Sequence, residues 1–283
     1  MKKSFQVIGM ISLICLSFIY TEKTVNVVKE VDEIMIQIKK ENSKYEQEPV
    51  DAIIKGDTIT PGLNGKKINE NTSYTNMKRI GSYNPNLLDY QMITPKISIK
   101  RIYDKYVVGG NSKKNIVSLM FIVQSSDNID NILNILKNKK VNANFFISSS
   151  WLEDNNNKLS EIIALGHNVG NLGNNMDYKH SDFVWMDTII KKVGKQKTGY
   201  CYNEEKDDEA LKICAMHKNY TIRPTITIST YPSVEIKESI KNGSIISLPI
   251  NGVVEQEIST IINFIQSKGY KIDTLNNLLK EET

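Results

Sequence analysis

The chain has 283 residues, of which 40% are hydrophobic and 24% charged, and its formal net charge is +4. This length and hydrophobic content suffice for one large domain, or for a medium domain and a small one. The mild basicity, with no cluster of Lys and Arg that alternates with aromatic residues, argues against a nucleic-acid-binding protein.

The N-terminal segment has the features of a targeting sequence. Met1-Lys2-Lys3 is positively charged, and the run from Phe5 to Tyr20 has no charged residue. No small-x-small site follows, so we favour an uncleaved signal-anchor at residues 1–22 over a cleaved secretory signal. As a helix the run spans roughly 24 Å, which is short of the ~30 Å bilayer core. We expect a cell-membrane protein whose main domain is extracytoplasmic, the alternative being a secreted protein.

Two short regions separate this segment from the main domain. Residues 23–49 are predicted to form a stalk helix, because apolar residues recur at helical spacing at Val27, Val31, Ile34 and Ile38. Residues 50–110 combine short strand and turn patterns, which is typical of a small accessory module. Its three prominent tyrosines suit packing in a small core better than stacking on sugars: Tyr74, Tyr83 and Tyr90.

Residues 111–283 alternate regularly between strand-like apolar runs and amphipathic helical patterns. About seven such units predict an α/β fold whose parallel sheet is closed or nearly closed into a barrel. A functional site is then expected at the carboxyl ends of the strands. Cys201 and Cys214 are 13 residues apart, so one disulfide is possible, and the sequence leaves their pairing open.

Five separated blocks of this region resemble, in order and spacing, the polysaccharide deacetylase family (carbohydrate esterase family 4). The blocks are 117–121, 141–147, 166–171, 242–246 and 268–275. The resemblance implies a distorted (β/α)7-type barrel that removes acetyl groups from chitin-like glycans or peptidoglycan. It also implies that one Asp and two His hold a divalent metal, usually zinc, which polarises the acetyl carbonyl and activates water. A second Asp is implied as base and a late His as acid.

The family's functional positions fall on residues that cannot perform this chemistry. The base and metal aspartates correspond to Ile122 and Val123, the metal histidines to Leu172 and Met176, and the acid histidine to Pro249. Ile, Val and Leu offer no lone pair to a metal, and a thioether is a poor ligand for zinc. We therefore expect no catalytic residue, no metal and no other cofactor at these positions.

Two hypotheses for function remain. The favoured one is a membrane-anchored, non-catalytic protein of the cell envelope that binds a cell-wall glycan or an envelope protein, or has a structural role. Its candidate glycan contacts are also explained as ordinary loop residues: Asn171, Asn174, Asn175, Asp177 and Tyr202.

The alternative is an active metal-dependent hydrolase that acts on carbon–nitrogen bonds other than peptide bonds. It would deacetylate peptidoglycan or another N-acetylated polysaccharide through a relocated site, and would then need zinc. Asp177, His180 and Asp182 are the best alternative metal cluster in the sequence. His167 matches a family histidine that precedes the metal pair, and we interpret it as structural.

Overall fold

The computed structural model describes residues 10–17, 19, 29–195 and 199–282. The chain divides into a smaller unit, residues 1–49 and 64–94, and a larger unit, residues 50–63 and 95–283. This division also changes units after residue 49, but it has no boundary at 110 and assigns residues 64–94 to the smaller unit. Residues 50–63 and 95–110 contribute strands to the main sheet, so they belong to the larger unit.

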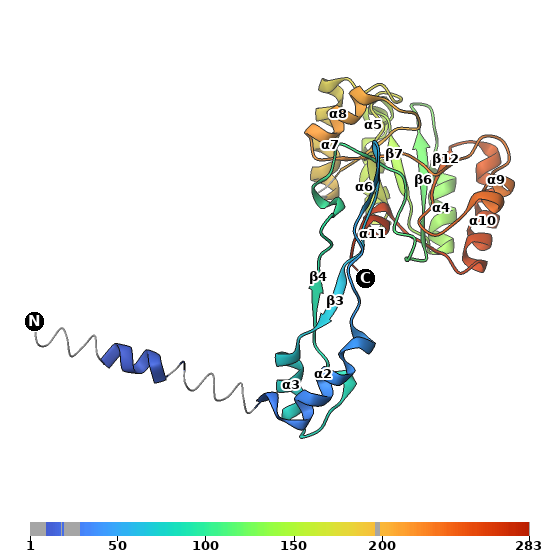
Figure 1. Cartoon of the computed structure of the whole chain (residues 1–283). Helices are drawn as coiled ribbons and strands as arrows, with labels where there is room; N and C mark the ends of the chain where they lie inside the picture. Colours follow the sequence, from blue (N-terminus) through green and yellow to red (C-terminus); the bar gives the residue numbers. More distant parts are fainter. Residues whose placement is uncertain (1–9, 18, 20–28, 196–198, 283) are drawn as a thin grey trace, which may run out of the picture. The chain divides into compact units, whose positions relative to one another are not determined.

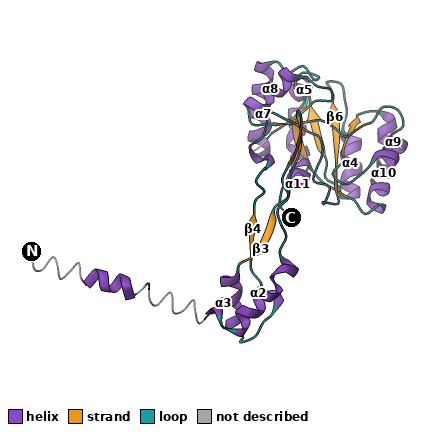
Figure 2. Ribbon diagram, viewed as in Figure 1, coloured by secondary structure: helices purple, strands orange, loops and turns teal. Residues whose placement is uncertain are grey.

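The smaller unit packs helices beside a two-stranded antiparallel sheet (Figure 2). Its elements are α2 (Glu33–Tyr45), β3 (Gly65–Ile68), α3 (Glu70–Lys78), the 3-10 helix η1 (Pro85–Leu87) and β4 (Tyr90–Ile93). The predicted stalk is therefore a packed helix: Ile34 and Ile38 of α2 are buried against Met77 of α3. Tyr74 and Tyr83 pack against the same core, as favoured from the sequence.

The larger unit is built on a curled half-barrel sheet (Figure 1), and the predicted α/β class is confirmed. The strand order is β1-β2-β5-β10-β9-β8-β7-β6-β12-β11, with β13 on β6; β1 pairs antiparallel with β2 and the other pairs are parallel. The sheet path ends at β1 and β11, so the barrel is open. The strands are β1 (Ile53–Lys55), β2 (Thr58–Thr60), β5 (Tyr106–Val107), β6 (Ile116–Val123), β7 (Asn144–Ile147), β8 (Asn168–Asn171), β9 (Tyr200–Tyr202), β10 (Tyr220–Ile222), β11 (Ile226–Thr227), β12 (Ile245–Pro249) and β13 (Lys271–Ile272).

Helices surround this sheet, and α4, α9 and α10 gather on one side of it in Figure 1. The helical elements are η2 (Ile99–Arg101), α4 (Asp130–Lys139), α5 (Ser149–Asp154), α6 (Asn156–Ala164), α7 (His180–Gly194), α8 (Asp208–Met216), α9 (Pro232–Ser239), α10 (Gly252–Ser267) and α11 (Leu275–Leu279).

Strand β6 is apolar at every position except Ser118, because it has a hydrophobic layer on each face. Leu119 and Phe121 belong to the large core under the helices, where the Phe121 ring stacks on Phe145 at a centroid distance of 5.2 Å. Met120 and Ile122 face the opposite way, into a second cluster on the inner side of the sheet. The period-two alternation of a strand thus assigns each position on β6 to one of the two layers.

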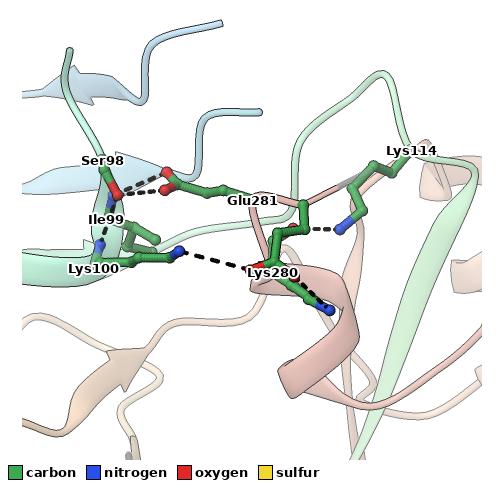
Figure 3. Close-up of polar contacts among 7 residues, drawn as sticks. Ser98, Ile99, Lys100, Lys114, Lys280 and Glu281 are labelled. Carbon is green, nitrogen blue, oxygen red and sulfur yellow. Dashed lines mark hydrogen bonds and ion pairs between the residues drawn. The ribbon is translucent and has the colours of Figure 1, made fainter. Parts of the chain in front are cut away.

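A buried carboxylate ties the C-terminal segment to distant parts of the larger unit (Figure 3). Glu281 is 1% exposed, and its Oε1 accepts hydrogen bonds from the backbone N–H groups of Gly62 and Ile99, each at 3.0 Å. The hydroxyl of Ser98 donates to the other carboxylate oxygen. Lys114 donates from Nζ to the carbonyl of Asn277, within α11, at 2.9 Å. These contacts hold residues 61–63 and 98–99 against the chain end.

The predicted membrane anchor is not supported by the described residues. Residues 10–17 are helical, but across the described ranges no helix is both long enough and apolar enough to cross a bilayer. The remainder of the predicted signal-anchor, residues 1–9, 18 and 20–22, lies outside the described residues.

Candidate functional site

The carboxyl ends of β6, β7, β8, β9 and β12 meet along one edge of the sheet. Their register places Ile122 beside Phe146 on one side and beside Pro249 on the other, and Ile147 beside Asn171. In open parallel sheets this edge is where ligands bind. The residues that correspond to the family's metal and catalytic residues lie at or near this edge: Ile122, Val123, Leu172, Met176 and Pro249.

Ile122 and Val123 end strand β6 and point to opposite faces of the sheet. Ile122 packs against the inner cluster, whereas Val123 is fully buried in the core beneath the helices. The backbone carbonyl of Val123 is also hydrogen-bonded, because it accepts from the N–H of Ser148 at 3.0 Å. Only Ile122 of the pair therefore borders the space on the inner side of the strand ends.

That inner space is filled by apolar side chains. Leu172 is 0% exposed and belongs to one cluster with Phe146 and Tyr202, against which Ile122 packs. The rings of Phe146 and Tyr202 lie 5.7 Å apart between centroids. Pro249, at the position of the acid histidine, has no group that titrates. A metal bound here would contact hydrocarbon, which provides no ligand.

Met176 lies on a tight turn that does not face this cluster. Asn174 and Asp177 form an antiparallel bridge across the turn, and Asn175 and Met176 have φ values of 51° and 74°. Positive φ at two successive central residues is the geometry of a type I′ turn. Met176 is 39% exposed and lines an open pocket with His180. The two positions of the family's metal histidines, Leu172 and Met176, therefore face different surroundings.

Gly173 allows this turn to begin. Its φ of 64° lies in the left-handed region, and a Cβ there would lie 2.6 Å from the carbonyl oxygen of Asp177. Only glycine fits both conditions without displacing the backbone. The turn is further fixed by Asn171, whose Oδ1 accepts a hydrogen bond from the Gly173 N–H at 2.7 Å.

The five candidate glycan contacts are not brought together. Asn171 is 2% exposed, and its side chain is used by Gly173 and by the carbonyl of Phe183. Tyr202 is 1% exposed, and its hydroxyl bonds Ser247 at 3.0 Å. Burial raises the pKa of the Tyr202 phenol to about 12. The three others are exposed on the turn after β8: Asn174, Asn175 and Asp177. Asn171 and Tyr202 thus serve the fold in this structure.

The alternative metal cluster is only partly brought together. Asp177 pairs with Lys179 at 3.6 Å, and the His180 ring lies 5.6 Å from that of His217. Asp182 lines a different pocket, beside Trp185. Among the described residues, no group of three or more His, Cys, Asp and Glu side chains could hold a metal ion. Asp177 and His180 line one pocket, whereas Asp182, two residues further along α7, lines the other.

His167 is placed as a structural residue, as interpreted from the sequence. It is 4% exposed, and its Nδ1 accepts a hydrogen bond from the backbone N–H of Ala143 at 3.1 Å. An acceptor Nδ1 requires the neutral imidazole. Burial lowers the pKa of His167 to about 4. The neutral ring is therefore built into the packing between β7 and β8, where it meets Phe145 edge to face.

Comparison with known proteins agrees with this geometry. Residues 109–241 match the family model for polysaccharide deacetylase. This part of the chain therefore resembles a polysaccharide deacetylase domain. The residues at its functional positions are consistent with a degenerate member of the family.

Similar proteins cover most of the chain. The uncharacterised protein YlxY of Bacillus subtilis is 24% identical over 281 residues, covering 91% of this chain and 87% of YlxY. The structure of BA3943 from Bacillus anthracis, described as a CE4 family pseudoenzyme, is 23% identical with a TM-score of 0.68, covering 89% of this chain and 96% of that chain. A BA3943 mutant is described as a pseudoenzyme with restored enzymatic activity. A family 4 carbohydrate esterase from Bacillus anthracis is 24% identical with a TM-score of 0.53, covering 62% of this chain and 86% of that chain.

Two features of the deacetylase domain were open or missed in the sequence. Cys201 and Cys214 form a disulfide between β9 and α8, and they pack with Tyr178 and Phe183 behind the turn after β8. Trp185, 40% exposed on α7, lines a polar pocket that sequence reasoning did not find. The available signal was its place on α7, off the buried face formed by Phe183, Met186 and Ile190.

Proposed function

We propose that the polysaccharide deacetylase domain of this protein is non-catalytic, and that it binds a glycan or an envelope protein, or has a structural role, at the cell envelope. The observation that carries the proposal is the apolar inner cluster at the strand ends, where Ile122 and Leu172 pack with Phe146 and Tyr202. A catalytic metal needs several ligands in fixed geometry, and Ile122, Leu172 and Phe146 offer none, while the Tyr202 hydroxyl bonds Ser247.

The remaining family positions support the same proposal. Val123 points into the core beneath the helices, and Met176 is exposed on a turn that faces another pocket. The likeness to BA3943 adds support, because that protein is described as a pseudoenzyme and the match covers 96% of its chain. Against the relocated site of the alternative hypothesis, Asp182 lines a different pocket from Asp177 and His180, and among the described residues no group of three or more His, Cys, Asp and Glu could hold a metal ion.

The disulfide supports an extracytoplasmic location. Disulfides form and persist in oxidising environments such as secreted proteins, and they are rare in the cytosol. The Cys201–Cys214 bond joins two elements of the deacetylase domain, and both cysteines are fully buried. The basic start and uncharged run at the N-terminus point to the same compartment.

Acetate release tests the absence of catalysis. The purified protein, supplied with zinc, is expected to release no acetate above the blank from acetylated chitooligosaccharide or from peptidoglycan, because the residues at the family's metal and catalytic positions provide neither a good zinc ligand nor a group that transfers a proton. The family 4 carbohydrate esterase from Bacillus anthracis serves as the positive control for the assay. Zinc-dependent release of acetate by this protein would refute the proposal.

A further inference from the structure

A polar pocket that the family positions do not occupy lies between the start of α5, the turn after β8 and the start of α7. Its volume is about 290 Å³, and its lining residues are Ser149, Ser150, Glu153, Asn174, Asp182 and Trp185. The N–H of Ser149 donates to the carbonyl of Gly173 at 2.9 Å. This bond joins two of the three walls, so the loops after β7 and β8 hold a defined shape.

Trp185 gives the pocket an apolar surface. The face of α7 that packs on the sheet carries Phe183 and Met186, and Trp185 is turned away from it with 40% of its surface exposed. The other tryptophan of the chain, Trp151, is 1% exposed. An indole ring left in water beside polar groups is typical of a binding site, because it offers a large rigid surface with little conformational entropy to lose.

The polar groups around Trp185 suit a ligand rich in hydroxyl and amine donors. Ser149 and Ser150 provide hydroxyls that donate and accept, Asn174 provides an amide, and Glu153 and Asp182 provide carboxylates that only accept when ionised. Within the described ranges, neither carboxylate forms an ion pair, and the lining residues include no Lys or Arg. The local charge is negative, so anionic ligands are disfavoured and cationic ones favoured.

We propose that this pocket binds an amino sugar, a saccharide unit that carries hydroxyls and a protonated amine. The apolar face of the sugar ring lies on Trp185, its hydroxyls bond the serines and Asn174, and its ammonium group lies near Glu153 and Asp182. The inference deepens the proposed function, on which it rests for the choice of a glycan as ligand. Its position is separate from the inner cluster of Ile122 and Leu172.

Titration of the full chain with three oligosaccharides tests the proposal. Isothermal titration calorimetry is run with a glucosamine tetramer, an N-acetylglucosamine tetramer and an oligogalacturonate of similar length. We expect the glucosamine tetramer to bind at least about tenfold more tightly than the acetylated one, and the anionic oligomer not to bind. Added salt should weaken binding of the glucosamine tetramer, since part of the attraction is between charges.

Variants locate the binding. Trp185→Ala is expected to weaken binding about tenfold or more, and Trp185→Phe by less, because phenylalanine keeps an aromatic face. Glu153→Gln combined with Asp182→Asn should remove the preference for the amine and keep some binding. Tyr231→Ala is the matched control, since Tyr231 is an aromatic residue that is 68% exposed elsewhere in the larger unit, and it should bind as the wild type does.

Several outcomes would overturn the pocket assignment. They are failure to bind any of the three oligomers, equal binding of the glucosamine and acetylated tetramers, tighter binding of the oligogalacturonate, or unchanged affinity in a folded Trp185→Ala variant. None of them depends on catalysis, whereas the proposal of a non-catalytic domain is refuted only by acetate release or by a catalytic metal. The two failures are therefore distinguishable.

Discussion

Replacing Glu281 with alanine is expected to lower the free energy of unfolding by about 3–5 kcal/mol. The carboxylate is 1% exposed, and it satisfies the backbone N–H groups of Gly62 and Ile99 and the hydroxyl of Ser98. Each buried donor left without a partner costs about 1–3 kcal/mol. Because these donors lie far apart in the sequence, their loss also releases two segments from the chain end.

Urea unfolding measures this effect. We expect the midpoint of Glu281→Ala to fall with an unchanged slope, which identifies a change in stability rather than in the surface exposed on unfolding. Glu282→Ala is the matched control. The neighbouring Glu282 pairs with Lys280 at 2.7 Å on the surface, and such pairs contribute about 0–1 kcal/mol. A loss below 1 kcal/mol for Glu281→Ala would contradict the role assigned to this carboxylate.

Acidification is expected to destabilise the protein through His167 by about 2–3 kcal/mol between pH 7 and pH 4.5. Burial lowers the pKa of the folded-state imidazole to about 4, below its ordinary value of 6.5. The unfolded chain therefore binds the proton first as the pH falls. The stabilisation is complete above pH 6.5 and decreases as the pH falls from about 6.5 to 4.

A variant that cannot titrate isolates this contribution. His167→Asn retains an acceptor for the N–H of Ala143, which bonds His167 Nδ1 at 3.1 Å in the wild type. Unfolding free energies at pH 7 and pH 4.5 should differ less for His167→Asn than for the wild type, by about 2–3 kcal/mol. His180→Asn changes an exposed histidine at the start of α7, and it should keep the wild-type dependence. Equal acid sensitivity of wild type and His167→Asn would show that His167 is not the cause.

The main sheet could be predicted from the sequence because its signals are local. Strand β6 is an apolar run from Ile116 to Val123 that contains one polar residue, Ser118, as expected for a strand buried on both faces. The amphipathic pattern of α10 ends near Gly269, as the structure has it. Such patterns reflect burial directly, so they predict both the elements and their alternation.

The domain division could not be predicted, because the strands that decide it are too short to carry a periodic signal. Strands β1 and β2 have three residues each and β5 has two, yet they join residues 53–60 and 106–107 to the main sheet. Likewise, the apolar stripe of α2 shows that one face is buried but not that it packs on α3. These facts depend on contacts between distant parts of the chain.

The candidate site was likewise predicted only in part. The resemblance to the family predicted apolar residues at two metal and catalytic positions, Ile122 and Leu172, and the structure adds that they pack into one cluster. The orientation of Met176 could not be predicted from the sequence. It depends on the positive φ of this residue, which follows from the turn closed by Asn174 and Asp177. Closeness in sequence likewise suggested one cluster of Asp177, His180 and Asp182, whereas Asp182 lines a different pocket from the other two.

The zinc content of the purified chain tests the absence of a catalytic metal most directly. The protein is incubated with excess zinc, freed of unbound ion by gel filtration and analysed by mass spectrometry. We expect zinc far below one ion per chain, because Ile122, Val123 and Leu172 offer no ligand and Met176 lies on an exposed turn. Stoichiometric zinc would contradict the account, and its loss in His180→Ala would place the metal at the cluster of Asp177, His180 and Asp182.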